Sequence, residues 1–287
     1  MKMTIKTRRL NRSLGGDISI NILLIIFGLF MALPMIYSIS SSLKPLDELW
    51  VYPPRFIVNN PTGKNYADLF SILSTSRIPF TKYVFNTVFV SVTGTFGHVL
   101  LSSMCAYALC KHKFHGQKLI FNVVVLSLMF STAVTTIPNF IIMAKLKWID
   151  TLAALIVPSF GAPLGLYLMK QFMEQIVPDS VLEAARIDGA GEFHVFFRIV
   201  MPMVKPAWLT LIIFSFQGLW NIGTTTYIYR EDLKTLNYAM SQILAGGVAR
   251  VGASAAASVM MMIVPVLLFV FTQSNIVETL ATSGMKD

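Results

Sequence analysis

Several side chains that could do chemistry lie together in one stretch of the chain, EAARIDGAGEFHVFFRIVMPMVKPA at positions 183–207. Its charged residues alternate with small and aromatic residues and are interrupted by glycine. The 287-residue chain around it is mostly apolar, with 55% hydrophobic and only 13% charged residues. A soluble domain carries about 25% charged residues. A charged segment in an otherwise apolar chain indicates a surface that docks either on a protein partner or on the membrane.

Catalytic and metal-binding patterns are missing from the sequence. No nucleophile–base pair or metal-ligand spacing joins the scattered histidines, which are His98, His112, His115 and His194. Cys105 and Cys110 fall within one expected helix and predict neither a disulfide nor a metal site. A phosphate-cradling loop of the form G-x-x-x-x-G-K-[ST] is also missing. An enzyme is therefore the least expected class, no cofactor is expected in this chain, and energy for uphill transport would come from a partner.

The apolar residues form six windows that contain no Asp, Glu, Lys or Arg, at 18–43, 83–110, 119–144, 151–169, 206–229 and 251–277. Each is near or above the roughly 18 residues that cross a hydrocarbon core. The windows do not alternate as barrel strands do, so they predict helices. We therefore expect an all-α, polytopic membrane protein with six transmembrane helices. The window at 206–229 is the least certain, because its strongly apolar part ends at residue 219.

The first window could also belong to a cleaved signal peptide, because the chain begins with the basic run KMTIKTRRLNR. Its apolar run is long for such a peptide and contains Pro34, which favours a retained anchor. Lys and Arg in the first 17 residues and in KHKFHGQK place both segments in the cytoplasm. Alternation then places the loop 169–206 and both termini in the cytoplasm. Basic loops beside an anionic leaflet explain the net charge of +9 without nucleic acid.

His98 is the one titratable residue expected deep in a span, and all charged residues lie outside the apolar cores. Intramembrane charges are costly and are kept for function. A lone histidine is more often a packed residue than a proton relay, so the pattern argues against a proton-driven pump. The spans also contain prolines that delete helical hydrogen bonds. These suit either a water-lined pathway or ordinary kinks; they are Pro34, Pro138, Pro158, Pro163 and Pro265.

The stretch at 183–207 predicts two short helices. Pro178 and Asp179 suit a helix start, and Ser180 with Glu183 matches a capping box. A glycine at 189 or 191 would end this helix in a left-handed turn. The second helix is expected to have one apolar face, formed by Phe193, Phe196, Phe197 and Val200. Pro202 and Pro206 are expected to end it. Helices this short need packing for stability, and the small, polar first helix favours a protein cleft over the membrane surface.

The pattern E-A-A-x-x-D-G-A, followed by F, I and P in FHVFFRIVMP, resembles the signature loop of permease subunits of binding-protein-dependent ABC importers. The segments SSLKPLDELWVYPPRF, NYADLF, YVFNTVFVSV, AYALCKHKFHGQK and IPNFIIMAKLKWIDTLAALIVP resemble the second permease type of the carbohydrate branch, in the same order. The resemblance covers nearly the whole chain. It implies the type I importer permease fold, with an N-terminal part at 1–82, a core at 83–273 that holds a coupling loop at 174–206, and a tail at 274–287.

In that family the loop forms a coupling helix that sits in a groove of a cytosolic ATPase. The resemblance implies that Glu183 forms an ion pair there and that Gly189 supplies the turn. The residues that it assigns to coupling are Glu183, Ala184, Ala185, Arg186, Asp188, Gly189, Phe193, Phe197, Ile199 and Pro202. The last four would hold the loop to the membrane domain. Met201 and Trp148 depart from the family pattern without removing the loop.

The resemblance also implies partners: a second permease, two ATPase subunits that bind ATP and Mg²⁺, and an extracellular lipid-anchored solute-binding protein. The outer loop at 222–250 would enter the cleft of that protein, and Lys286 in the tail would reach the ATPases unless the terminus is frayed. Side chains that could face sugar, or else anchor helices, are Asn86, Asn139, Gln217, Trp220 and Asn221. Trp220 could equally belong to an aromatic belt.

The segments PPRF and ETLATSGMK resemble importers of complex oligosaccharides in Gram-positive bacteria, including fragments that contain uronic acids. We therefore expect an importer permease in the bacterial cell membrane. Two other functions stay open: a permease for a non-sugar solute such as a peptide, and a membrane signalling or scaffold subunit.

Overall fold

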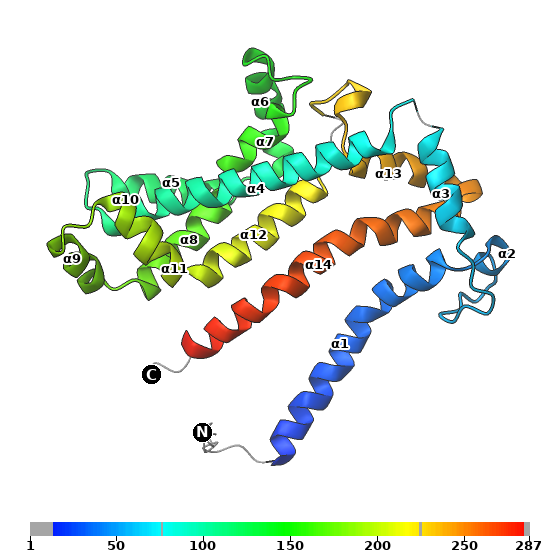
Figure 1. Ribbon diagram of the computed structural model, residues 1–287, viewed down its shortest axis with the longest axis horizontal. Coiled ribbons are helices and arrows are strands. Elements are labelled where there is room, and N and C mark those ends of the chain that lie inside the picture. Colours follow the sequence, from blue (N-terminus) through cyan, green and yellow to red (C-terminus); the bar gives the residue numbers. More distant parts are fainter. Residues whose placement is uncertain (1–13, 76, 224–225, 284–287) are drawn as a thin grey trace. The chain divides into compact units, whose positions relative to one another are not determined.

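The computed structural model describes residues 14–75, 77–223 and 226–283, and these residues form helices and turns without a strand, as expected (Figure 1). The α-helices are α1 Leu14–Ser42, α2 Leu46–Leu49, α3 Lys64–Ser74, α4 Phe80–Lys111, α5 Gln117–Ser127, α6 Thr132–Lys145, α7 Ala153–Phe160, α8 Pro163–Ile176, α9 Asp179–Ile187, α10 Glu192–His194, α11 Met201–Met203, α12 Lys205–Trp220, α13 Leu236–Leu244 and α14 Val251–Ser283. A π-helical turn at Val195–Val200 joins α10 to α11. Short 3₁₀ turns lie at Glu231–Leu233 and Gly247–Arg250.

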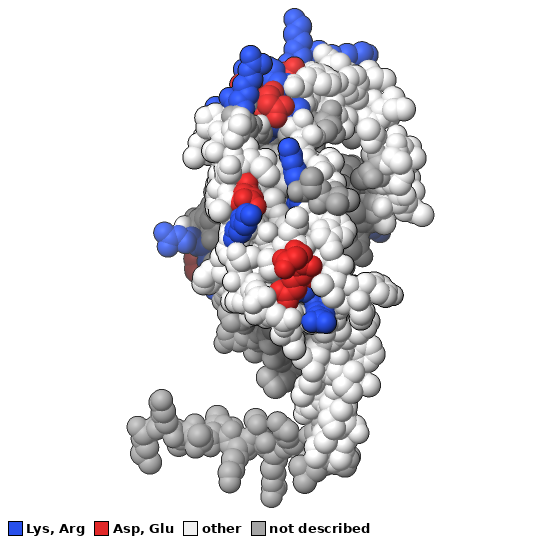
Figure 2. Space-filling view, turned by 90° about the vertical axis from the view of Figure 1, so that its right-hand side faces the viewer, with Lys and Arg blue, Asp and Glu red and all other residues white. Residues whose placement is uncertain are grey.

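In the described part of the chain, four helical segments are long and apolar enough to cross a membrane: Ile18–Ser42, Phe80–Lys111, Ala153–Ile176 and Val251–Gln273. There is a fifth span if the helical segments Glu192–Met203 and Lys205–Trp220 are counted as one span that is bent by 81°. The space-filling view shows small groups of charged residues separated by wide uncharged surface, as a membrane protein requires (Figure 2). The predicted count of six spans is therefore not confirmed.

One part of the difference lies at 206–229, where α12 alone has 16 residues. The other lies in the window predicted at 119–144, which is divided into α5 and α6. Leu128 N–H and Met129 N–H bond back to Val125 and Leu126 at 3.2 and 3.0 Å, which tightens the end of α5. Ser131 is then extended, with φ −72° and ψ 152°, and a new helix begins after it. Two short apolar helices thus replace one long span.

The chain divides into two compact units: residues up to 69 with 248–259, and residues 70–247 with those from 260 onward. In the first unit, Asn65 Nδ2 donates to the carbonyls of Ser42 and Lys44 at 2.9 and 2.7 Å. Lys44 is only 2% exposed and donates to the carbonyl of Arg55. A Cβ atom at position 252 would lie 2.2 Å from Asn65 Oδ1, so Gly252 permits this close packing.

The second unit is organised around α4, which packs against α7, α8 and α12 (Figure 1). Small residues allow these helices to approach closely, as in membrane bundles generally. A Cβ atom at Gly94 would lie 2.5 Å from Leu219, and one at Gly97 would lie 2.1 Å from the ring of Phe160. A Cβ atom at Gly165 would lie 2.2 Å from His98 Nε2, so this position is equally crowded.

His98 joins three of these helices and is packed rather than open to a pathway. Its Nε2 lies 3.2 Å from the carbonyl of Ala162, at the break between α7 and α8, and its Nδ1 lies 3.1 Å from Ser215 Oγ on α12. A carbonyl can only accept a hydrogen bond, so Nε2 carries the proton. Pro163, expected as an internal kink, instead begins α8, where a proline needs no N–H partner.

Candidate functional site

The first helix of the predicted docking loop is α9, whose start differs in detail from the expectation. Pro178 is its N-cap, with φ −70° and ψ 141°, and no side chain caps the helix. The predicted capping box of Ser180 and Glu183 is therefore wrong, because the N-cap lies two residues before Ser180, which falls inside the first turn of the helix. The first turn is instead held by Lys111 at the end of α4, which donates to Val177 O at 2.6 Å and to Asp179 Oδ1 at 2.7 Å. The hydrogen bond and the charge of Lys111 lower the pKa of Asp179.

The last turn of α9 closes as the glycine pattern predicts. Gly189 has φ +80°, a conformation that an L side chain rarely adopts. Its N–H bonds to Arg186 O at 3.0 Å, and Ala190 N–H bonds to Ala185 O at 3.0 Å. This pair of bonds is the Schellman ending of a helix. Gly191 has φ −70° and serves as the N-cap of α10, so the left-handed turn belongs to Gly189.

The two faces of α9 differ strongly. Leu182 and Ala185 are 2% and 8% exposed and pack in the apolar cluster that also includes Met173 and Val195. Ala185 therefore faces the core of this chain, although the resemblance places it on the docking surface. The opposite face carries Glu183, Ala184 and Asp188, which are exposed, and Ile187, which is 86% exposed. An exposed, partly apolar helical face backed by a firm core can bind another protein.

The second half of the loop does not present the single apolar face that was predicted. Val195, Phe196 and Val200 are buried, whereas Phe193 and Phe197 are 72% and 49% exposed. The π-helical turn explains the split, because its wider i→i+5 spacing rotates successive residues away from the 3.6-residue period. Of the remaining residues that were expected to hold the loop, Ile199 is half-buried and packs against the same cluster, and Pro202 is exposed.

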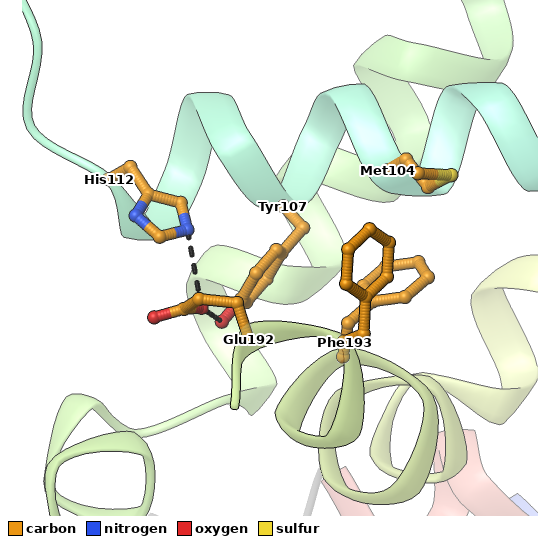
Figure 3. Close-up of a pocket in the computed structure, with 6 residues that line it drawn as sticks. Met104, Tyr107, His112, Glu192 and Phe193 are labelled. Carbon is orange, nitrogen blue, oxygen red and sulfur yellow. Dashed lines mark hydrogen bonds and ion pairs between the residues drawn. The ribbon is translucent and has the colours of Figure 1, made fainter. Parts of the chain in front are cut away.

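A polar cluster beside the loop was not predicted from the sequence. Glu192, the first residue of α10, points toward Tyr107 and His112 at the end of α4 (Figure 3). Tyr107 Oη donates to Glu192 Oε2 at 2.7 Å, and His112 Nε2 lies 3.5 Å from the same oxygen. Arg186 Nε donates to the other oxygen, Oε1, at 2.9 Å. A small cavity of about 170 Å³ is bordered by Tyr107, His112, Glu192 and Phe193.

The five candidate sugar-facing residues differ in burial, and only Gln217, Trp220 and Asn221 lie together, at the end of α12, where Asn221 Nδ2 donates to Gln217 O at 3.0 Å. Asn86 is 1% exposed and donates to the carbonyls of Asp232 and Lys234, at 2.9 and 3.0 Å. Trp220 is 3% exposed, and its Nε1 donates to Met261 O at 3.1 Å. These two side chains therefore anchor neighbouring helices and loops, which is the alternative that the sequence left open. The exposed candidates are Asn139, Gln217 and Asn221.

The geometry offers an exposed helix face that another protein can contact. Within residues 14–75, 77–223 and 226–283, no three His, Cys, Asp or Glu side chains gather as a metal-binding group. Lys286 and the basic residues of the first 13 positions lie outside the described residues.

Comparison with known proteins agrees with this arrangement. Residues 98–281, more than half of the chain, match the family of the binding-protein-dependent transport system inner membrane component. The chain is 31% identical over 201 residues to the diacetylchitobiose uptake system permease protein NgcG of Streptomyces coelicolor, a match that covers 69% of this chain and 64% of the relative. It is 34% identical to the polygalacturonan/rhamnogalacturonan transport system permease protein YtcP of Bacillus subtilis, over 73% of this chain and 70% of the relative.

A chain of a bacterial ABC transporter involved in the import of the acidic polysaccharide alginate has the same fold. Its TM-score is 0.76 at 22% identity, with 93% of this chain and 99% of that chain covered. The match to NgcG spans somewhat less than two thirds of that relative's length. The chain is a multi-pass membrane protein that belongs to the family of binding-protein-dependent transport system inner membrane components.

Proposed function

We propose that this chain is the permease subunit of an ATP-driven importer that moves oligosaccharides across the bacterial cell membrane. The relatives named above support a saccharide, because their names give diacetylchitobiose and polygalacturonan or rhamnogalacturonan. Polygalacturonan is a uronic-acid polymer, and the structural neighbour imports an acidic polysaccharide. Oligosaccharides that contain uronic acids are therefore the first substrates to test.

The observation that carries the proposal is the two-faced α9. One face is fixed to the core by Leu182 and Ala185, while Glu183, Ala184 and Ile187 remain exposed on the other. This is what a helix needs if it is to enter a groove of a separate ATPase and pass movement to the membrane domain. ATP and Mg²⁺ would be bound by that ATPase, since this sequence has no phosphate-cradling loop.

The complete importer would contain a second permease, two ATPase subunits and an extracellular lipid-anchored solute-binding protein. The family description, a binding-protein-dependent system, supports the last of these. Both termini would lie in the cytoplasm, together with the loop that carries α9, because of the basic residues in the first 17 positions and after α4.

The loop at 222–250 would meet the binding protein on the opposite side, through its exposed tip rather than through α13. Tyr229 is 58% exposed, and its N–H and that of Arg230 donate to Asp150 Oδ1 at 2.5 and 2.9 Å. In α13, by contrast, Leu236 and Met240 are buried. Deleting 237–246 would therefore damage the core. Substitution of Tyr229 and Arg230 by alanine tests the docking role without that damage.

The decisive experiment reconstitutes the chain with its companion permease, ATPase subunits and binding protein in proteoliposomes. ATP hydrolysis is measured with and without oligogalacturonides or neutral oligosaccharides. Gly189→Pro should abolish the saccharide-stimulated part, because proline fixes φ near −65° and removes the N–H that bonds Arg186. Gly191→Pro is the matched control, since φ there is already −70°.

If a saccharide stimulates hydrolysis in the wild type and in Gly191→Pro but not in Gly189→Pro, the result supports both the importer function and the coupling role of the docking loop. Equal stimulation in the wild type and Gly189→Pro would contradict the coupling role of this loop. If peptides stimulate hydrolysis and no saccharide does, the chain is a permease for a non-sugar solute.

A further inference from the structure

Glu192 lies directly after the open turn that follows α9, and its side chain links α9 to α4. Residues 188–191 connect α9 to α10 and include two glycines, at which an added Cβ atom would meet nothing within 4 Å. Each carboxylate oxygen of Glu192 accepts a hydrogen bond from a different helix: Oε1 from Arg186 of α9 and Oε2 from Tyr107 of α4. Glu192 thus bridges α9 and α4 through a single side chain.

The last turn of α4 is also tied to the beginning of α9. Lys111 donates to Val177 O and to Asp179 Oδ1 there. α9 is therefore attached to α4 at its first turn by Lys111 and at its last turn, through Arg186, by Glu192. Apolar packing of Leu182 and Ala185 holds the helix down, but it is non-directional. Two directional attachments, by contrast, fix the rotation of α9 about its own axis.

We infer that Glu192 is a positioning residue for coupling: it makes α9 and α4 move together when the ATPase moves α9. α4 packs along α7, α8 and α12, so movement delivered to its end reaches the membrane-spanning bundle. The inference rests on the proposed function, because it gives a role to one residue of the docking loop.

The exposure of the cluster separates this role from a merely structural one. The side chains of Arg186 and Glu192 are 38% and 47% exposed. Ion pairs of this kind contribute little to folding stability. Tyr107 is firmly placed without its hydroxyl, because its ring packs 5.5 Å from that of Phe196 and edge-on to His112 at 5.2 Å. Loss of the Glu192 contacts should therefore leave the fold intact and change the transmission of movement.

The first test measures oligogalacturonide uptake and ATP hydrolysis in the reconstituted complex. Glu192→Ala should reduce the saccharide imported per ATP hydrolysed by about tenfold, with unchanged copurification of the ATPase. Tyr107→Phe, which removes only the hydroxyl, should give a smaller loss in the same ratio. Glu174→Gln is the matched control, because Glu174 is 52% exposed but pairs with Lys170 within α8. The exchange Arg186→Glu with Glu192→Arg should restore part of the ratio.

A second measurement needs no saccharide. Nitroxide labels at Cys105 of α4 and at Val181→Cys of α9, both exposed, report the distance between the two helices in a Cys110→Ser background. In the wild-type complex this distance should remain single and narrow with and without ATP and vanadate. Glu192→Ala should broaden it when ATP and vanadate are present.

Three results would overturn the inference. In the first, Glu192→Ala imports as much saccharide per ATP hydrolysed as the wild type does. In the second, the distribution of label distances in that variant stays narrow with ATP and vanadate. Loss of ATPase copurification in Glu192→Ala would also overturn it, because the residue would then be needed only to fold the loop. Failure of the proposed function looks different: the wild-type chain itself would not associate with the ATPase, and no solute would stimulate hydrolysis.

Discussion

The two ends of α4 hold neighbouring segments by different chemistry. At the N-terminal end, Asn86 and Thr87 are buried and bond to main-chain groups of residues 232–236, with Leu236 N–H donating to Thr87 Oγ1 at 2.7 Å. At the C-terminal end, Tyr107 and Lys111 bond to the carboxylates of the docking loop, of which Asp179 is 78% exposed. At the N-terminal end, Asn86 and Thr87 thus make neutral, buried hydrogen bonds, although Tyr83 there also donates to Glu231 Oε1 at 2.8 Å. At the C-terminal end, both attachments involve carboxylates that water can reach.

The two ends of α4 should therefore contribute differently to folding stability. Breaking a buried hydrogen bond leaves a polar group unpaired in the apolar interior, so the segment beside Asn86 is held in one conformation. Exposed charged contacts can be broken and remade at little cost, because water replaces the lost partner. The contacts that attach α9 to the end of α4 should therefore add less to the free energy of unfolding than the buried hydrogen bonds at the other end. The predictions below test this contrast.

The largest effect is expected at Asn86. Asn86→Ala leaves the carbonyls of Asp232 and Lys234 without their donor, and it should lower the free energy of unfolding by about 2–3 kcal/mol. Unfolding in detergent, followed by intrinsic fluorescence, measures the change. Asn139→Ala is the control, because Asn139 is exposed. Equal effects of the two substitutions would remove the distinction between the buried end of α4 and the surface.

A smaller loss is expected from Thr87→Val, which keeps the shape of the side chain but removes the acceptor for Leu236 N–H. One unpaired main-chain donor should cost about 1–2 kcal/mol. Thr93→Val provides the comparison, since Thr93 is only half-buried and its hydroxyl donates to Phe89 O within its own helix. A change at Thr93 as large as that at Thr87 would show that the segment after residue 231 is not held by this bond.

Only part of this contrast could be read from the sequence. The left-handed helix end has a local signature, which predicted a turn at Gly189 or Gly191, and the structure has it at Gly189. Tyr107 and Glu192 were missed, because residues so distant in the chain meet only through tertiary packing, and the motifs that contain them do not indicate that they meet. Asn86 was considered for sugar contact, since an amide in an apolar window suits either role, and only the position of the loop decides.

The fold shows the same division between local and tertiary signals. The absence of charge identifies apolar segments, and it predicted the membrane class. It does not detect where an apolar segment turns, so α5 and α6 were taken as one span. Nor does a 3.6-residue period anticipate the π-helical turn at Val195–Val200, which separates Phe193 and Phe197 from the buried Phe196.

At the charged end of α4, Lys111→Met should destabilise the protein by about 1 kcal/mol, less than Asn86→Ala does. Water can reach Asp179, so the remaining cost is chiefly the loss of the donor to Val177 O. Lys113→Met is the matched control for loss of a positive charge, because Lys113 is exposed. A loss at Lys111 that exceeds the loss at Asn86 would reverse the proposed order of the two ends.

The smallest effect is a dependence on pH at Asp179. Lys111 lowers the pKa of this carboxyl below its ordinary value of 3.8, first by its hydrogen bond and then by its charge. A lowered pKa means that the folded state favours the ionised form, so the contribution is fully present above pH 3.8 and disappears as pH falls through the lower, folded-state pKa. The difference in unfolding midpoint between wild type and Asp179→Asn should be constant near neutral pH and vanish in strong acid. A difference that grows on acidification would mean that Lys111 does not hold the ionised carboxylate, and the charged end of α4 would then be described wrongly.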